Sequence, residues 1–141
     1  MKIGLICPNF PPASAEGGIE HYSERLAREW ARLGHHVVVF TDGGHLFGKG
    51  NARDLRIESL SERWSWKTAI SIRQKADRLR LHTVCLQYSP AMYRFAFTWT
   101  WALAFIGRRP AVFFHTMWGK PLRHRVAGLL LLLFAGRMVA T

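Results

Sequence analysis

Short apolar runs alternate along the chain with longer stretches of helical periodicity. Residues 3–7 form a continuous apolar run that stops at Pro8, which cannot continue the hydrogen-bond ladder of a central strand. Apolar side chains then recur at intervals of three and four over residues 19–33, and Gly34 follows as a natural helix C-cap. Residues 36–41 are typical of a second buried strand, so the pattern predicts a βαβ unit with a right-handed crossover.

The same alternation continues to the end of the chain. We predict, in order, a strand over Leu55–Leu60, a helix over Trp66–Leu81, a strand over Thr83–Tyr88, a helix over Pro90–Gly107, a strand over Ala111–His115, a helix over Pro121–Gly136, and a sixth strand beginning at Met138. This order indicates an α/β fold with a doubly wound parallel sheet, Rossmann-like, whose ligands bind at the carboxyl ends of the strands. No linker or repeat divides residues 1–141, which we expect to form one domain.

Composition supports a buried core, because 49% of the 141 residues are hydrophobic, too many for a disordered chain. Cys7 and Cys85 lie in apolar runs without metal ligands nearby, so we expect small buried side chains in a reducing compartment. No signal peptide is visible, which favours the cytoplasm. The apolar runs 95–107 and 126–136 are too short to cross a bilayer and are interpreted as helices in a core or at an interface.

Positive charge is concentrated in the second half of the chain, which contributes most of the net charge of +11. Residues 71–141 contain Asp77 as their only acidic side chain. A basic surface beside exposed aromatic residues attracts anionic lipid, nucleic acid or a phosphorylated substrate, and charge alone does not distinguish these partners. We find no nucleic-acid-binding motif and expect no such partner. A non-catalytic basic module that binds a membrane surface or a protein partner remains an alternative function.

The loop before the first predicted helix ends in Gly17 and Gly18. Two glycines allow backbone N–H groups to approach an anion, and the helix N-terminus adds partial positive charge, so the loop predicts a phosphate site; a simple tight turn is the other interpretation. The loop matches neither the Gly-x-Gly-x-x-Gly fingerprint nor a Walker P-loop, which disfavours an NAD enzyme and a nucleoside triphosphatase. His35 and His36 lack a neighbouring carboxylate or thiolate, so we expect no metal.

These features together resemble the amino-terminal part of GT-B glycosyltransferases, in particular glycosyltransferase family 4. The resemblance is carried by the first strand ending at Pro8, the segment Gly17-Gly-Ile-Glu-His21, the helix that follows, the strand over 36–41 and the later strand ending in His115. It implies a two-domain enzyme that transfers a sugar, usually with retention, from a UDP- or GDP-linked donor to an acceptor such as a lipid-linked or polysaccharide precursor. The family needs no metal or other cofactor.

The resemblance also implies that residues 1–141 are the acceptor-side half of a GT-B fold, truncated at about the sixth strand. The carboxyl-terminal donor-binding domain, with its basic residues and paired glutamates, is absent, so we expect the fragment alone to be inactive. In the family the two glycines reach toward the donor phosphates, a role that falls to Gly17 and Gly18. The histidine near the transferred sugar matches His115, our candidate catalytic residue; a structural histidine at a strand end is the alternative.

Four further residues are candidates for substrate binding. Glu20 and His21 follow the two glycines, and Lys120 and Arg123 follow the fifth predicted strand. Glu20 is explained equally well by compensation of the helix dipole, and the two basic residues by an ordinary solvated face. Cations beside Trp99 and other aromatic residues suit an anionic acceptor or a lipid headgroup, so attachment to the inner face of the membrane stays open.

Overall fold

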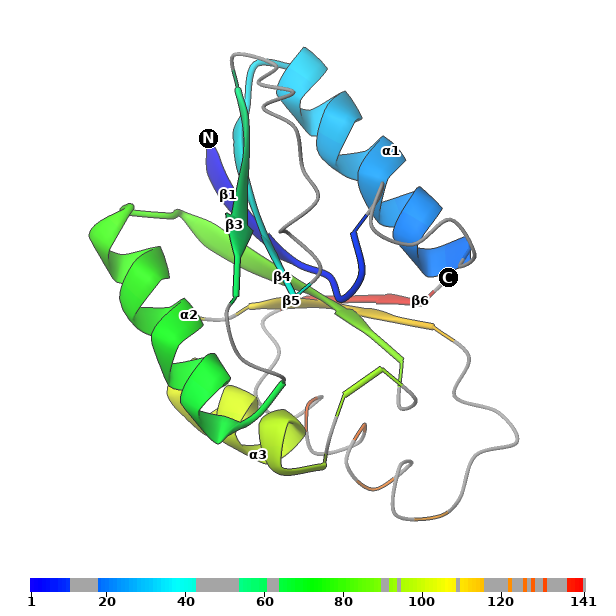
Figure 1. Ribbon diagram of the computed structural model, residues 1–141, viewed down its shortest axis with the longest axis vertical. Coiled ribbons are helices and arrows are strands. Elements are labelled where there is room, and N and C mark those ends of the chain that lie inside the picture. Colours follow the sequence, from blue (N-terminus) through cyan, green and yellow to red (C-terminus); the bar gives the residue numbers. More distant parts are fainter. Residues whose placement is uncertain are drawn as a thin grey trace.

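The computed structural model describes residues 1–10, 18–42, 54–60, 64–89, 92–93, 95–108, 110–115 and 137–140, together with residues 122, 126, 128 and 131. Six strands form one sheet: β1 (Lys2–Ile6), β2 (His36–Thr41), β3 (Leu55–Ser59), β4 (Thr83–Tyr88), β5 (Ala111–Phe114) and β6 (Arg137–Ala140). The sheet has the order β3-β2-β1-β4-β5-β6, and each neighbouring pair is parallel. The predicted doubly wound, Rossmann-like α/β fold is confirmed (Figure 1).

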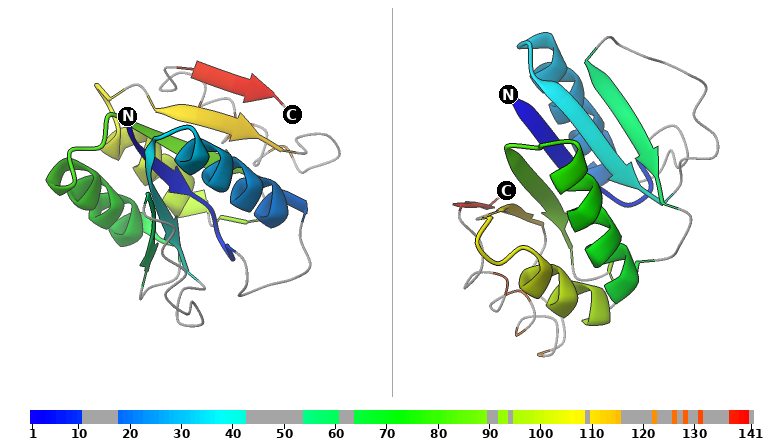
Figure 2. Two further views of the ribbon diagram at one scale, coloured as in Figure 1. Left: turned by 90° about the horizontal axis from the view of Figure 1, so that it is seen from above. Right: turned by 90° about the vertical axis from the view of Figure 1, so that its left-hand side faces the viewer.

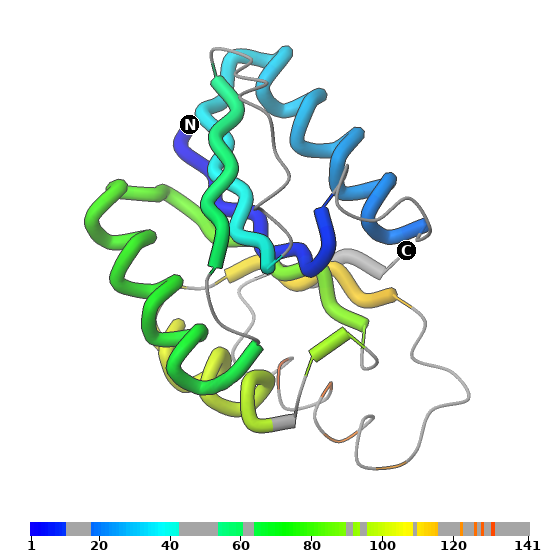
Figure 3. The backbone as a smooth tube through the Cα atoms, in the orientation of Figure 1, coloured from blue at the N-terminus to red at the C-terminus, as the bar shows by residue number. Residues whose placement is uncertain are grey.

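Helices cover both faces of this sheet. Helix α1 (Gly18–Arg32) lies on one face, and α2 (Trp66–Arg78) and α3 (Phe95–Ala104) lie together on the other (Figure 2). From β3 the chain returns through α2 to β4, which pairs with β1 on the side away from β2 (Figure 3). The direction of winding therefore reverses between β1 and β4. In parallel α/β sheets, the carboxyl ends of the strands at such a switch point form the ligand-binding crevice.

The helix boundaries differ from the sequence prediction in local ways. Helix α2 begins at Trp66 as predicted, behind a capping box in which the Ser65 and Thr68 side chains and backbone N–H groups bond reciprocally. Helix α3 spans Phe95–Ala104, shorter at both ends than the predicted 90–107. Of the predicted helix over 121–136, residues 122, 126, 128 and 131 are described and are helical. Gly34, with φ of +79°, takes the left-handed conformation expected after α1.

The contact between α1 and the sheet is made by smaller side chains than the periodicity suggests. Ser23 and Ala27 are the buried residues of the helix, and the Ser23 hydroxyl donates to the Ile19 carbonyl at 2.7 Å. Small side chains along this line allow the helix backbone to lie close to β2 and β3. As a result Tyr22, which the periodicity places on the apolar stripe, is partly exposed and turns toward β5.

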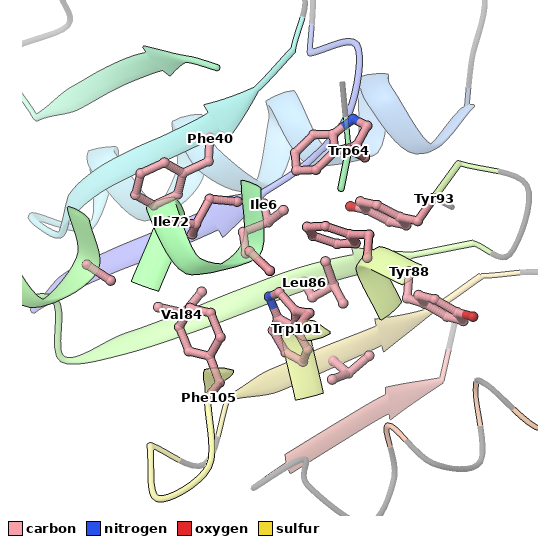
Figure 4. Close-up of a cluster of buried hydrophobic side chains, with 14 of the residues drawn as sticks. Ile6, Phe40, Trp64, Ile72, Val84, Leu86, Tyr88, Tyr93, Trp101 and Phe105 are labelled. Atoms are coloured by element: carbon pink, nitrogen blue, oxygen red, sulfur yellow. The ribbon is translucent and has the colours of Figure 1, made fainter. Parts of the chain in front are cut away.

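The larger core lies between the sheet and the helices α2 and α3, and aromatic side chains fill it (Figure 4). Tyr93 stacks on Phe97 with ring centroids 4.8 Å apart. Deeper in the core, Trp101 stacks on Phe105 at 5.2 Å, and both rings are completely buried. Val84, Leu86 and Tyr88 belong to the same core cluster, so this aromatic core packs α3 against β4.

Both cysteines are free and buried, as the sequence predicts. Burial raises the pKa of each thiol to about 12, so at pH 8 only about one thiol in 10⁴ is a thiolate. We expect neither Cys7 nor Cys85 to react with a disulfide reagent such as DTNB at pH 8 while the protein is native. Both should react after unfolding in urea. Rapid labelling of either residue in the native protein, read by mass spectrometry, would contradict the packing described here.

Candidate functional site

Three adjacent strands end in a row of polar side chains beneath α1. Strands β1, β4 and β5 are neighbours, and on the face that α1 covers their ends carry Cys7, Gln87 and His115. The row follows from the sheet geometry, because alternate residues of parallel strands point to the same face. It crosses the switch point between β1 and β4, where a ligand is expected in this fold.

His115 is held in one orientation by hydrogen bonds to β4. Its backbone N–H donates to the Tyr88 carbonyl at 2.8 Å, and its Nε2 lies 2.6 Å from Oε1 of Gln87. An amide oxygen only accepts hydrogen bonds, so the Nε2 atom carries the proton. Burial lowers the pKa of His115 below its ordinary value of 6.5, and the ring is therefore neutral at pH 7. In this tautomer Nδ1 is a hydrogen-bond acceptor.

Gln87 is fully buried, and within the described residues its Nε2 atom has no hydrogen-bond partner. Burying an amide whose N–H groups are unpaired lowers stability. The same amide supplies the acceptor that fixes His115. The structural effect of Gln87 is therefore to fix the orientation of His115, at a cost in stability.

Tyr22 connects the first turns of α1 to this pair. Its ring meets the His115 ring edge to face, with centroids 5.6 Å apart and an interplanar angle of 70°. Gly18 lies one helical turn before Tyr22 and therefore on the same side of α1, about 6 Å along the axis. The N-terminus of α1, with its partial positive charge, is thus placed beside the carboxyl end of β5.

Neither packing nor backbone conformation requires a glycine at position 18. A Cβ atom added there would meet no other atom within 4 Å. Within the described part of the chain the glycines with positive φ are Gly34 and Gly107, so Gly18 does not have the left-handed conformation of a tight turn. Gly18 instead leaves its backbone open to the solvent, as the predicted phosphate site requires. Gly17 lies outside the described residues.

A groove with a volume of about 500 Å³ runs along this side of α1 and includes Gly18 and His21. Its lining residues in the described part of the chain are Gly18, His21, Tyr22, Arg25, Leu26 and Glu29. Glu20 is not among them. The negative charge of Glu20 is instead near enough to Cys7, at the end of β1, to contribute, after burial, to the raised pKa of that thiol. Of the four predicted substrate-binding residues, Lys120 and Arg123 lie outside the described residues.

Two wider properties concern metals and membranes. Among the residues the structure describes, no three His, Cys, Asp or Glu side chains come close enough to hold a metal ion. In the same part of the chain, no helix has both the length and the apolar character needed to cross a bilayer.

Comparison of the sequence with known protein families assigns the chain to one of them. The model of the glycosyl transferase 4-like domain matches residues 17–140, which is most of the chain. The chain belongs to the glycosyl transferase 4-like domain family. The resemblance drawn from the sequence is thereby confirmed, and a glycosyltransferase-type role is favoured over a non-catalytic binding module. No protein of curated function matches the chain in sequence.

Several solved structures of bacterial enzymes have a fold similar to that of this chain. The Bordetella bronchiseptica enzyme WbmG, in complex with NAD and UDP, superposes with a TM-score of 0.63 at 14% identity, covering 98% of this chain and 51% of that one. WbmH from the same organism, in complex with NAD+, superposes with a TM-score of 0.62 at 10% identity, covering 99% of this chain and 54% of that one. A putative epimerase from Burkholderia cenocepacia J2315 superposes with a TM-score of 0.57 at 15% identity, covering 99% of this chain and 52% of that one.

These likenesses show the fold alone, because the identities are so low. The glycosyl transferase 4-like chain spans about half the length of each of these structures. Their NAD is a property of those enzymes, and the first loop of this chain lacks the Gly-x-Gly-x-x-Gly fingerprint that brings backbone close to a dinucleotide pyrophosphate.

Sequence reasoning missed two members of the site. Gln87 lies in the apolar run 83–88 and reads as an ordinary strand residue, although a polar side chain next to the end of a central strand is itself a signal. Tyr22 belongs to the apolar series over residues 19–33, whose spacing gives no sign of a role in a site. Only the packing of α1 against the sheet brings both residues to His115.

Proposed function

We propose that the protein containing this chain transfers a sugar from a UDP- or GDP-linked donor to a glycan or lipid-linked acceptor. In this proposal the chain is the acceptor-side domain of a retaining, metal-independent GT-B enzyme, and a second domain binds the donor. Family membership supports the transferase class. The observation that carries the finer proposal is the buried His115–Gln87 pair under the first turns of α1, at the switch point of the sheet.

The site residues have distinct roles in this proposal. Gly18 and the N-terminus of α1 face the donor diphosphate and stabilise its negative charge as the sugar leaves. His115 stays neutral and accepts a hydrogen bond from a hydroxyl of the transferred sugar at Nδ1. This interaction orients the sugar and needs no proton transfer. His21 and Arg25 line the adjacent groove and bind the acceptor, together with Lys120 and Arg123, which follow β5 in the sequence.

The direct test is transfer by the full-length protein. Radiolabelled UDP- and GDP-sugars are incubated with the protein and with membrane extracts or polysaccharide fragments as acceptors, and labelled product is separated from donor. We expect transfer from one class of donor, in the presence of EDTA, with the donor's anomeric configuration retained. We also expect no turnover by residues 1–141 alone. If no donor supports transfer or slow hydrolysis, the proposed activity is wrong.

The open space at Gly18 gives a specific prediction within this assay. Replacing Gly18 by valine should reduce transfer by at least about tenfold, because the branched side chain occupies the space through which phosphate reaches the backbone. The melting temperature should stay within about 2 °C of the wild-type value, since nothing packs at this position. Kinetics and a thermal melt are measured on the same preparation.

Arg32→Val is the matched control. It introduces the same side chain at the opposite end of α1, where Arg32 is exposed and pairs with Glu29 on the surface. We expect this variant to retain full activity. Full activity in Gly18→Val as well would remove the first turn of α1 from the donor site.

A further inference from the structure

Large apolar side chains are exposed along the outer side of α3. Trp99, Leu103 and Ile106 recur at intervals of four and three, and Leu103 and Ile106 are 58% and 57% exposed. No charged residue occurs in α3, whose inner side forms the aromatic core. A helix that is apolar on all sides is normally buried on all sides. In α3, by contrast, Trp99 and Leu103 are exposed on one side.

Helix α2 extends this exposed surface. Trp66 and Ile70 are one turn apart on the outer side of α2, and Trp66 is 50% exposed. The two helices lie side by side on the same face of the sheet, joined by a hydrogen bond of 2.9 Å from Arg73 Nη1 to the Ala104 carbonyl (Figure 2). We name the combined surface the α2–α3 apolar face; it consists of Trp66, Ile70, Trp99, Leu103 and Ile106.

Positive charge surrounds this face. Six described cations lie on α2 or directly after α2 and α3: Lys67, Arg73, Lys75, Arg78, Arg80 and Arg108. Of these, Lys75 pairs with Glu58 of β3 at 3.0 Å. The acidic side chain of this region, Asp77, forms ion pairs with both Arg73 and Arg108. The Lys67 ammonium lies 5.7 Å from the centre of the Trp66 ring. Tryptophan and aliphatic side chains beside an excess of cations are the combination that binds an anionic lipid surface.

We propose that the α2–α3 apolar face binds the surface of an anionic lipid bilayer, with Trp99, Leu103 and Ile106 inserted at the headgroup level. A second copy of the chain is a poorer partner, because a two-fold contact through this face would bring the cations of both copies together. The proposal is independent of the proposed transferase activity. Membrane binding through this face would nevertheless place the candidate site near the bilayer. Helix α2 begins after the carboxyl end of β3, so Trp66 lies at the same edge of the sheet as His115.

Vesicle co-sedimentation of the full-length protein tests the proposal. We expect binding to vesicles of phosphatidylcholine with about 30% phosphatidylglycerol, weak binding to pure phosphatidylcholine, and weakening by salt. Leu103→Glu should lower the partition coefficient at least about tenfold, because it removes an inserted side chain and adds a repelled charge. Leu33→Glu is the matched control. Leu33 is 62% exposed after α1, on the other side of the sheet, and its replacement should change binding less than about twofold.

Each result decides the proposal. Equal losses in Leu103→Glu and Leu33→Glu would mean that binding follows net charge without using this face, and would overturn it. The proposal would also be overturned if the wild-type protein did not bind anionic vesicles, or if it formed a dimer that Leu103→Glu abolished. Circular dichroism melts accompany both variants. If Leu103→Glu fails to fold, the milder pair Leu103→Gln and Ile106→Gln replaces it, with the same tenfold loss expected for the double variant.

Discussion

His115→Ala should reduce sugar transfer by the full-length protein about 10²–10³-fold, which corresponds to roughly 3–4 kcal/mol of lost transition-state stabilisation. The histidine is a buried polar side chain with a fixed orientation, and it lies at the end of β5, next to β4 and the switch point of the sheet. Its removal leaves a substrate hydroxyl without its acceptor. The loss should appear mainly in kcat, measured with saturating donor and acceptor, because the hydrogen bond orients the reacting sugar.

A second variant separates an active role of His115 from a structural one. Gln87→Glu places a carboxylate 2.6 Å from Nε2 in place of the amide oxygen. A nearby negative charge raises the pKa of the imidazole, whereas burial lowers it in the wild-type protein. Wild-type transfer should therefore stay constant from pH 8 down to the ordinary histidine pKa of 6.5 and fall below it, as the neutral acceptor becomes protonated. In Gln87→Glu this acid limb should move to higher pH.

Two outcomes would argue against this role. If His115→Ala transfers sugar at the wild-type rate, the histidine is a structural residue that ends β5. If the acid limb is identical in the wild-type protein and Gln87→Glu, another group controls it. A thermal melt of each variant is needed beside the kinetics, because both residues are buried.

The order of the elements was accessible from the sequence because each element is encoded by a local period. Apolar runs of strand length alternate with amphipathic stretches, and that alternation is enough to predict a parallel, doubly wound sheet. The location of the ligand edge follows from the same rule. His115 is selected at that edge because it matches the histidine that the resemblance to glycosyltransferase family 4 implies near the transferred sugar. Its hydrogen-bond partner, Gln87, could not be selected from the sequence. The contact with Gln87 joins residues 28 apart through the pairing of β4 with β5, which no local pattern specifies.

In helices α1 and α3 the spacing of apolar residues does not predict which side packs against the sheet. In α1 the spacing identifies an apolar stripe that contains Tyr22, but the small Ser23 and Ala27 determine which side meets the sheet. The stripe is therefore rotated, and Tyr22 becomes part of the site. In α3 nearly every side chain is apolar, so no stripe exists to assign. The inner side of the helix lies in the core, as one of the two interpretations of this run predicts. The other interpretation, an interface, stays a prediction for the exposed side.

The inner side of α3 gives the largest expected effect on stability. Trp101→Ala should lower the free energy of unfolding by about 3–5 kcal/mol, because it empties a completely buried position and removes the ring that stacks on Phe105. A domain of this size has a total stability of about 5–15 kcal/mol, so the variant should be close to unfolding at 37 °C. Urea denaturation followed by circular dichroism measures the change.

Leu103→Ala is the control for this loss, since it truncates an apolar side chain of the same helix on the exposed side. Its cost should stay within about 0.5 kcal/mol. Trp101→Phe should recover most of the stability, because it keeps an aromatic ring in the cavity and removes an indole N–H that has no acceptor among the described residues. A loss in Leu103→Ala as large as that in Trp101→Ala would mean that the outer side of α3 is packed against protein, and the membrane-binding face would then have to be abandoned as well.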